Sequence, residues 1–150
     1  MDLDPLSSNI KNFWKENRNS SCTKCSLHKN VKNVCVFGNG STETKGMVVF
    51  DYPTEMDDQY GRQVPSNALM YLEKVLEEEG IELNSLYSTY AVKCSINELY
   101  KGKPEAMLKE CSLLYLEKEI ELIKPKAILT LGPVAYYNFS HKNGLVKNRG

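Results

Sequence analysis

The residues best suited to chemistry in this chain are cysteines that stand at a metal-binding spacing. Two form a Cys-x-x-Cys pair near the N-terminus and two single cysteines follow far downstream, which gives the set Cys22, Cys25, Cys94 and Cys111. The close pair places two thiolates within reach of one metal ion or cluster. Only folding can bring the distant cysteines to the same centre, so the spacing predicts a metal site built from three segments.

The spacing alone leaves the kind of metal open. By number, four thiolates suit zinc and an iron–sulfur cluster equally well. Structural zinc sites usually take their ligands from two close pairs, whereas single ligands from separate elements favour a larger cluster. The competing interpretation is that Cys94 and Cys111 are small buried apolar residues, a common role of free cysteine. Cys35 has no place among four ligands, and we predict that it lies in the core.

The chain has the size and composition of one soluble globular domain, which we expect over residues 1–150. Its 150 residues are sufficient to bury a core, and its apolar (41%) and charged (25%) fractions are ordinary. The basic and acidic residues cancel, at nineteen each. This balance neither supports nor excludes DNA binding, because a local basic patch is sufficient for it.

Whether the cysteines form disulfides depends on the cellular compartment of the protein. The N-terminus is polar and acidic, unlike a secretory signal, and no apolar run approaches the ~18 residues that span a bilayer. We therefore predict a cytoplasmic (intracellular) protein with no membrane partner. In a reducing compartment, a cysteine cluster is more often a metal site or a catalytic thiol than a set of disulfides.

The elements that must position these cysteines alternate along the chain. Short apolar runs of the kind found in buried parallel strands predict strands at residues 47–50, 86–92 and 127–131. Amphipathic patterns and capping signals predict helices at residues 8–17, 67–79, 105–123 and 134–139. Loops are expected at residues 31–46 and 51–65. The alternation predicts an α/β fold, a three-layer sandwich with a mainly parallel central sheet.

In an open α/β sheet, ligands bind beyond the carboxyl ends of the strands. The predicted ends lie at residues 50–54, 92–94 and 131–133. Cys94 follows the second strand directly, and Cys111 lies in the first turns of the long predicted helix. We therefore expect the chemistry at this edge of the sheet.

Several segments together resemble the family 4 uracil-DNA glycosylases. They are Cys22-Thr23-Lys24-Cys25-Ser26-Leu27, Met47-Val48-Val49-Phe50-Asp51-Tyr52-Pro53-Thr54, Gly61-Arg62, Tyr87-Ser88-Thr89-Tyr90-Ala91-Val92-Lys93-Cys94, Glu110-Cys111, Ile123-Lys124-Pro125-Lys126-Ala127-Ile128-Leu129-Thr130-Leu131-Gly132 and Lys147-Asn148-Arg149-Gly150. The resemblance runs from about residue 22 to the end of the sequence. It implies a glycosylase fold that carries a four-iron, four-sulfur (4Fe-4S) cluster, with Cys22, Cys25, Cys94 and Cys111 as ligands and DNA as the partner.

The sequence departs from the family where the base is handled. The family's first strand ends in Gly-Glu-Ala-Pro-Gly, which positions the attacking water, and the matching Phe50-Asp51-Tyr52-Pro53-Thr54 keeps a shorter carboxylate. The resemblance implies that Asp51 is the catalytic carboxylate and that Tyr52, Pro53, Val64 and Tyr90 occupy the substrate-binding positions. Val64 falls in the segment where the family stacks the base on an aromatic ring. Tyr90 replaces an asparagine that reads the uracil edge, and a phenol lacks that donor–acceptor pair.

These positions also have ordinary structural interpretations. Asp51 fits a turn after a strand, and Tyr52 and Tyr90 fit plain packing roles. The family's C-terminal His-Pro-Ser segment, which stabilises the leaving base, is absent from this sequence. We therefore expect a domain that lacks the C-terminal portion of the family, with base excision impaired.

Three functions follow from these patterns. The first is a uracil-DNA glycosylase-like iron–sulfur protein that acts on or binds DNA. The second is a non-catalytic glycosylase-like module associated with a replication protein, such as a viral or bacterial DNA polymerase. The third is a zinc-stabilised α/β domain unrelated to DNA.

Overall fold

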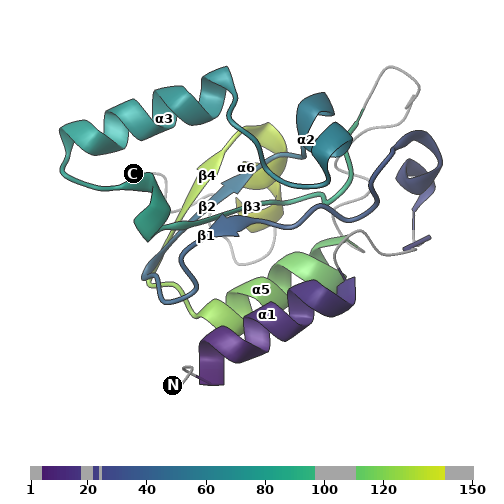
Figure 1. Cartoon of the computed structure of the whole chain (residues 1–150), viewed down its shortest axis with the longest axis horizontal. Coiled ribbons are helices and arrows are strands. Elements are labelled where there is room, and N and C mark those ends of the chain that lie inside the picture. The colour runs from purple at the N-terminus through teal and green to yellow at the C-terminus, as the bar shows by residue number, and fades with distance from the viewer. Residues whose placement is uncertain (1–4, 18–21, 24, 97–110, 141–150) are drawn as a thin grey trace.

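The computed structural model describes residues 5–17, 22–23, 25–96 and 111–140 (Figure 1). Its helices are α1 (Pro5–Asn17), α2 (Glu55–Tyr60), α3 (Asn67–Glu78), α5 (Glu117–Ile123) and α6 (Pro133–Ser140), with short helical turns η1 (Ser26–Asn30), η2 (Leu83–Ser85) and η3 (Ser112–Leu116). The described strands are β1 (Asn39–Gly40), β2 (Gly46–Phe50), β3 (Tyr87–Tyr90) and β4 (Ala127–Leu131).

The four described strands form one sheet in the order β1-β3-β2-β4. β2 runs parallel to both β3 and β4, with Phe50 opposite Tyr90 on one side and opposite Leu131 on the other. Only β1, at the edge of the described sheet, runs antiparallel to β3. The carboxyl ends of the three parallel strands therefore meet at one edge, as the sequence predicts.

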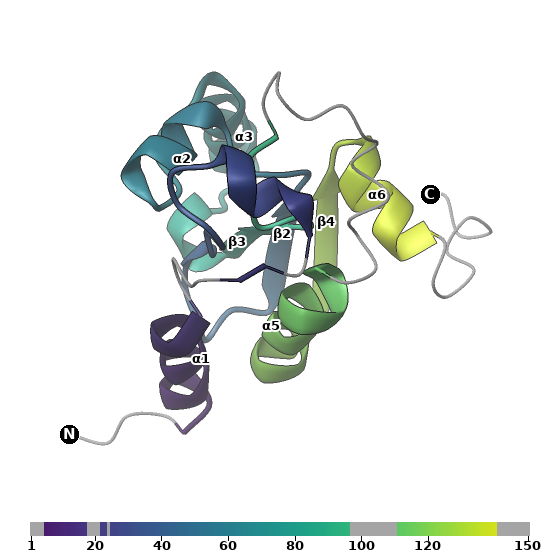
Figure 2. The same cartoon turned by 90° about the vertical axis from the view of Figure 1, so that its right-hand side faces the viewer.

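Helices cover both faces of this sheet. α1 and α5 lie side by side on one face, and α2 and α3 lie on the other (Figures 1 and 2). α6 follows β4 and lies beside it (Figure 2). The predicted α/β three-layer arrangement with a mainly parallel sheet is confirmed.

Two short elements lie in segments that we expected to be loops. β1 falls within residues 31–46, and α2 falls within residues 51–65. α2 begins with a capping box, in which Thr54 accepts from the Asp57 backbone N–H and the Asp57 carboxylate accepts from the Thr54 N–H. It ends at Gly61, which takes the left-handed conformation at φ 69°. Its buried residues are Asp57 and Asp58 rather than apolar ones, so hydrophobic periodicity does not reveal it.

β4 corrects a second expectation. The run of residues 127–131 does form a strand, but it is not buried. Leu129 is 44% exposed, and the other residues of β4 are half-buried or exposed. The reason is position, because β4 is at the outer edge of the described sheet, whereas β2 and β3 lie inside it. The predicted second strand is also shorter than expected, since β3 spans Tyr87–Tyr90 only.

The long predicted helix, residues 105–123, is described only from Cys111 onward, and residues 105–110 lie outside the described residues. Its described part begins with the π-helical turn η3 and continues as α5. In the parts of the chain that the structure describes, no helix is both long enough and apolar enough to cross a membrane.

Candidate metal centre

All five cysteines of the chain line one pocket. Its lining includes Cys22, Cys25, Cys35, Cys94 and Cys111, together with His28, Lys93 and apolar side chains. Three of the sulfur-bearing residues are buried in the core, and Cys22 and Cys25 are half-buried at its margin. The structure thus brings together the four cysteines singled out by spacing, and it adds Cys35 to them.

Different elements deliver the cysteines to this pocket. Cys25 precedes η1, which is fixed to the core through the buried Leu27. Cys94 lies in the turn that follows β3, and Cys111 lies directly before η3. Since β3 and η3 belong to different parts of the fold, the tertiary structure, not local sequence, creates the pocket.

Cys35 is both a core residue, as predicted, and part of the pocket, which was not predicted. Its side chain is 1% exposed, and its backbone takes the left-handed conformation at φ 63°, which is uncommon for a residue with a side chain. This conformation directs its N–H to the Sγ of Cys94, at 3.5 Å. The positive φ is not visible in the sequence, because no glycine marks it.

A second backbone N–H also donates to a pocket sulfur. The Lys93 N–H donates to the Sγ of Cys111, at 3.2 Å. Hydrogen bonds to sulfur stabilise a thiolate and are among the features that tune iron–sulfur centres. The pocket therefore has amide donors directed at the two most deeply buried of the four predicted ligands.

Without a bound metal, burial keeps these thiols protonated. Burial raises the pKa of Cys94 to about 11, partly offset by the Cys35 N–H. Burial also raises the pKa of Cys111 to about 12, and the Lys93 N–H and the Lys93 charge act against that rise. A metal must displace these protons when it binds.

The donor set suits a thiophilic metal. Four or five sulfurs in a largely apolar pocket fit zinc or an iron–sulfur cluster and do not fit magnesium or calcium, which require oxygen ligands. Among the described residues, no three His, Cys, Asp or Glu side chains stand in an arrangement that would hold a metal ion. His28 turns its Nδ1–H to the Cys25 carbonyl, at 2.5 Å, which fixes the ring beside the pocket.

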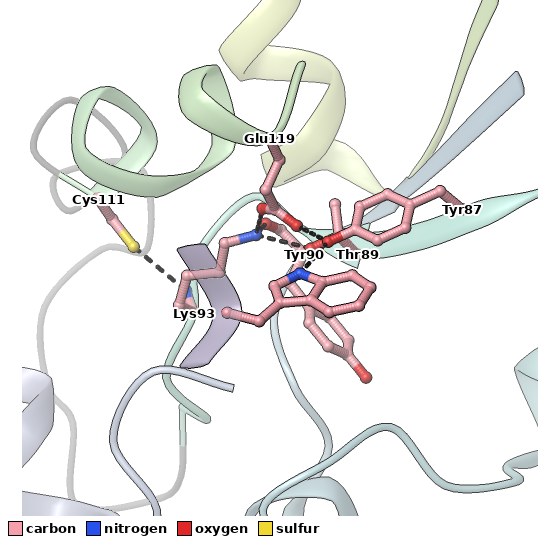
Figure 3. Close-up of polar contacts among 7 residues, drawn as sticks. Tyr87, Thr89, Tyr90, Lys93, Cys111 and Glu119 are labelled. Atoms are coloured by element: carbon pink, nitrogen blue, oxygen red, sulfur yellow. Dashed lines mark hydrogen bonds and ion pairs between the residues drawn. The ribbon is translucent and has the colours of Figure 1, made fainter. Parts of the chain in front are cut away.

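Beneath the pocket lies a buried polar network that the sequence analysis missed (Figure 3). The Lys93 ammonium is paired with the carboxylate of Glu119, and the side chains are 1% and 0% exposed. Tyr87 donates its hydroxyl to the same carboxylate and accepts from the Trp14 indole N–H, at 2.9 Å. The sequence does contain one sign that Glu119 is buried. Glu119 stands four residues from Tyr115 and from Ile123, on the apolar side of its helix.

Asp51, the predicted catalytic carboxylate, lies just past the carboxyl end of β2 and contacts α6. Its Oδ1 accepts from the Ala135 N–H, at 2.8 Å, and so caps the first turn of that helix. Gly132 permits this approach, since a Cβ there would lie 2.3 Å from Oδ1 and the backbone has a φ of 114°. The turn-forming interpretation of Asp51 therefore has a specific partner in the structure.

Tyr90 and Val64 meet at a different carboxylate, that of Asp57. The Tyr90 hydroxyl donates to Asp57 Oδ2, at 2.7 Å, and the Val64 N–H donates to Oδ1, at 2.8 Å. All three residues are buried. Burial, followed by the neighbouring Asp57 charge, raises the pKa of Tyr90 far above its ordinary range.

The remaining predicted substrate-binding residues flank this group. Pro53 is buried, and Tyr52 is half-buried against the core. The structure thus places Tyr90 and Val64 around Asp57, whereas Asp51 caps the first turn of α6. Asp57 was missed by the sequence analysis, although the Thr-x-x-Asp pattern of residues 54–57 is a capping signal that could have found it.

Comparison with known proteins agrees with this architecture. The model of the uracil DNA glycosylase superfamily matches residues 27–149. The type-4 uracil-DNA glycosylase of Thermotoga maritima is 35% identical over 89% of this chain and 69% of its own length. That of Pyrobaculum aerophilum is 32% identical over 90% of this chain and 63% of its own length. That of Sulfurisphaera tokodaii is 34% identical over 75% of this chain, and the match covers 50% of that relative.

The matched region contains the described sheet, the strand ends and two of the four predicted cysteine ligands, Cys94 and Cys111. The match therefore extends over most of the described fold, from η1 to α6, and is not confined to one motif. The chain belongs to the uracil-DNA glycosylase superfamily.

Proposed function

We propose that this chain is a DNA-binding, uracil-DNA glycosylase-like domain that holds a 4Fe-4S cluster and excises uracil poorly. The observation that carries the proposal is the convergence of Cys22, Cys25, Cys94 and Cys111 on one pocket at the carboxyl side of the sheet. The names of the relatives supply the substrate class, a uracil base in DNA.

The four cysteines would hold the cluster, and the cluster would join the N-terminal segment, the end of β3 and the start of η3. The pocket supports this assignment by its thiol content and its amide donors to sulfur. Zinc is the alternative, and metal analysis separates the two, because only the cluster brings acid-labile sulfide. Cys35 remains a fifth sulfur in the same pocket.

Poor excision follows from the strand ends. Tyr90 fills the position at which the resemblance expects an amide that pairs with uracil, and its hydroxyl is already committed to Asp57. Asp51 is committed to α6 through the Ala135 N–H. A base can enter only if Tyr90 moves, and a water-activating role of Asp51 competes with its capping role.

A second candidate is a non-catalytic module that binds DNA without excising a base, for example as an attachment of a replication protein. The same closed group of Tyr90, Asp57 and Val64 favours it. The two candidates differ in one measurable respect, which is whether replacing Tyr90 restores excision.

The test uses anaerobically purified protein on single- and double-stranded uracil DNA, with abasic sites as the readout. We expect slow excision by the unmodified chain and excision on the order of tenfold faster by Tyr90→Asn, the gain of one base-edge hydrogen-bond pair. Tyr90→Phe is the matched control, because it keeps the ring and should not gain activity.

If both the unmodified chain and Tyr90→Asn bind uracil DNA and neither excises the base, the non-catalytic module is favoured. Failure to bind uracil DNA at all would overturn both candidates. The thermal midpoint and visible absorbance of each variant must first show that the fold and the cluster are retained.

A further inference from the structure

The buried network beneath the cysteine pocket touches the segments that carry Cys35, Cys94 and Cys111. Lys93 stands directly before Cys94, and Glu119 lies on α5, the helix that continues from Cys111 through η3. Figure 3 shows the Lys93 side chain extending from the Cys94 segment toward Glu119, with the backbone of the same residue facing Cys111. One residue thus joins two predicted ligands.

Lys93 is held by several groups at once. Its ammonium is paired with Glu119 and donates to the Thr89 hydroxyl, at 2.7 Å, and to the Tyr90 carbonyl, at 2.8 Å. All of these partners are buried. A charge in this position has no freedom to move independently of β3 and α5, so its backbone N–H is fixed against the Cys111 sulfur as well.

The network also includes α1, the helix that precedes the Cys-x-x-Cys pair in the sequence. Tyr87 bridges the Glu119 carboxylate to the Trp14 indole, and the two rings stack with centroids 5.7 Å apart. α1 packs against α5, as Figures 1 and 2 show, and the sequence that follows α1 leads to Cys22 and Cys25.

The Cys35 segment is attached to the same residue. The Val36 N–H donates to the Lys93 carbonyl, at 2.7 Å, so this segment runs beside the end of β3. The Lys93 ammonium also lies 5.2 Å from the centroid of the Phe37 ring, within the range of a cation–π contact.

We propose that the buried Lys93–Glu119 pair is the positioning device of the metal centre, which sets the relative placement of the segments carrying Cys35, Cys94 and Cys111 before any metal binds. Lys93 is a positioning residue and not a ligand, because an ammonium has no lone pair to offer. Only the metal readouts of the test rest on the proposed function, since the arrangement of the segments exists without a cluster.

Stability alone does not explain such a pair. A buried ion pair pays a large desolvation cost, and replacing both partners by neutral side chains of similar shape is often neutral for stability. Removing one partner is different, because it leaves an uncompensated buried charge. The informative variant is therefore the double replacement Lys93→Met with Glu119→Gln, which removes both charges and keeps both shapes.

The control is an exposed ion pair on the same helix. Lys118 and Glu121 are 3.4 Å apart, and their side chains are 54% and 68% exposed. The double replacement Lys118→Met with Glu121→Gln makes the same chemical change at the surface. Any effect common to both double variants is not specific to the network.

The first measurement is backbone hydrogen exchange of the full chain without metal. We expect exchange about tenfold faster in peptides that cover residues 90–96 and 111–116 of the network variant, with the thermal midpoint within the range of the control. Uniformly faster exchange with a lowered midpoint would show a general stabilising role and overturn the proposal. Unchanged exchange in both peptides would overturn it as well.

The second measurement concerns the reconstituted protein. We expect the network variant to release iron to a chelator about tenfold faster than the control, the low end of the effect of groups that orient metal ligands. The electron paramagnetic resonance spectrum of the reduced cluster should also change. Release at the control rate with an unchanged spectrum would overturn the proposal. If the unmodified chain takes up no iron, the proposed cluster fails, and the exchange result alone decides the role of Lys93.

Discussion

Two buried carboxylates, Glu119 and Asp57, both accept a hydrogen bond from a tyrosine of β3, yet they lie in different surroundings. Glu119 accepts from Tyr87 and lies beneath the cysteine pocket, together with Lys93. Asp57 accepts from Tyr90 and from the backbone of the segment that contains Val64. The first cluster lies beside the cysteine pocket, whereas the second contains Tyr90 and Val64, two of the predicted substrate-binding residues.

The difference between them is the charge balance. Glu119 is paired with a buried ammonium, and the pair connects three elements that are distant in sequence. Asp57 is satisfied by neutral donors, the N–H groups of Thr54 and Val64 and the Tyr90 hydroxyl. Within one fold, the carboxylate beside the cysteine pocket belongs to an ion pair, whereas the carboxylate beside Tyr90 is held by neutral donors alone.

The largest expected effect falls on the cysteine pocket. Cys111→Ser removes one of the four predicted ligands from a buried position, so we expect near-complete loss of iron and of the brown absorbance, with a clearly lower thermal midpoint. Visible spectroscopy and metal analysis after anaerobic purification measure both. Full absorbance with an unchanged midpoint would contradict the ligand assignment.

The same experiment on Cys35 sharpens the assignment within the pocket. Cys35→Ala keeps the backbone N–H that donates to Cys94, and it removes a sulfur that has no place among four ligands. We expect the variant to retain its iron. If Cys35→Ala loses iron and Cys111→Ser does not, the ligand set contains Cys35 in place of Cys111.

The next effect concerns the Asp57 cluster. Asp57→Ala removes the acceptor of the buried Val64 N–H, of the Tyr90 hydroxyl and of the N–H of the exposed Thr54, which we expect to cost about 3 kcal/mol of unfolding free energy. Tyr90→Phe removes one neutral donor and should cost about 1 kcal/mol. Chemical denaturation of both variants measures the two values. Equal losses would mean that the backbone donors contribute nothing beyond the tyrosine contact.

The smallest effect is a dependence on alkaline pH. Burial, followed by the nearby carboxylates, raises the pKa of Tyr87 and of Tyr90 above the ordinary value of 10.0. In the unfolded chain both phenols ionise near pH 10, while in the folded protein they remain protonated. The unfolded state therefore binds fewer protons, and stability should fall as the pH rises above about 10.

The thermal midpoint of the metal-free chain between pH 8 and pH 11 measures this dependence. Tyr90→Phe should reduce the slope, because it removes one of the two phenols. An identical slope in the variant would show that Tyr90 ionises normally in the folded state.

The sequence predicts the parts of the structure that depend on apolar pattern. The parallel strands at residues 47–50 and 127–131 and the helices around residues 67–79 and 134–139 are present close to their expected bounds. The joint placement of the four cysteines in one pocket was expected from their metal-binding spacing. β1 and α2 were not predicted, since neither has apolar periodicity.

The buried polar groups were the harder part. In the sequence, nothing distinguishes the partners of Lys93, Glu119 and Asp57 from other polar residues. Lys93 and Glu119, for example, are 26 residues apart, and a single sequence does not show which distant charges will pair. The partner of Asp51 on α6 is equally hidden, since Ala135 contributes only its backbone. The apolar pattern of the sequence predicts the main strands and helices, whereas the partners of buried charges depend on the tertiary fold.

The π-helical turn η3 changes the direction in which Glu119 points around the helix axis, relative to Cys111. Glu119 lies eight residues after Cys111, so an uninterrupted α-helix would point the two side chains about 80° apart around its axis. A π turn accommodates roughly one extra residue and rotates the following residues by about one α-helical step in the opposite sense. The irregular turn thus lets a single helix direct a sulfur and a carboxylate into the same buried layer.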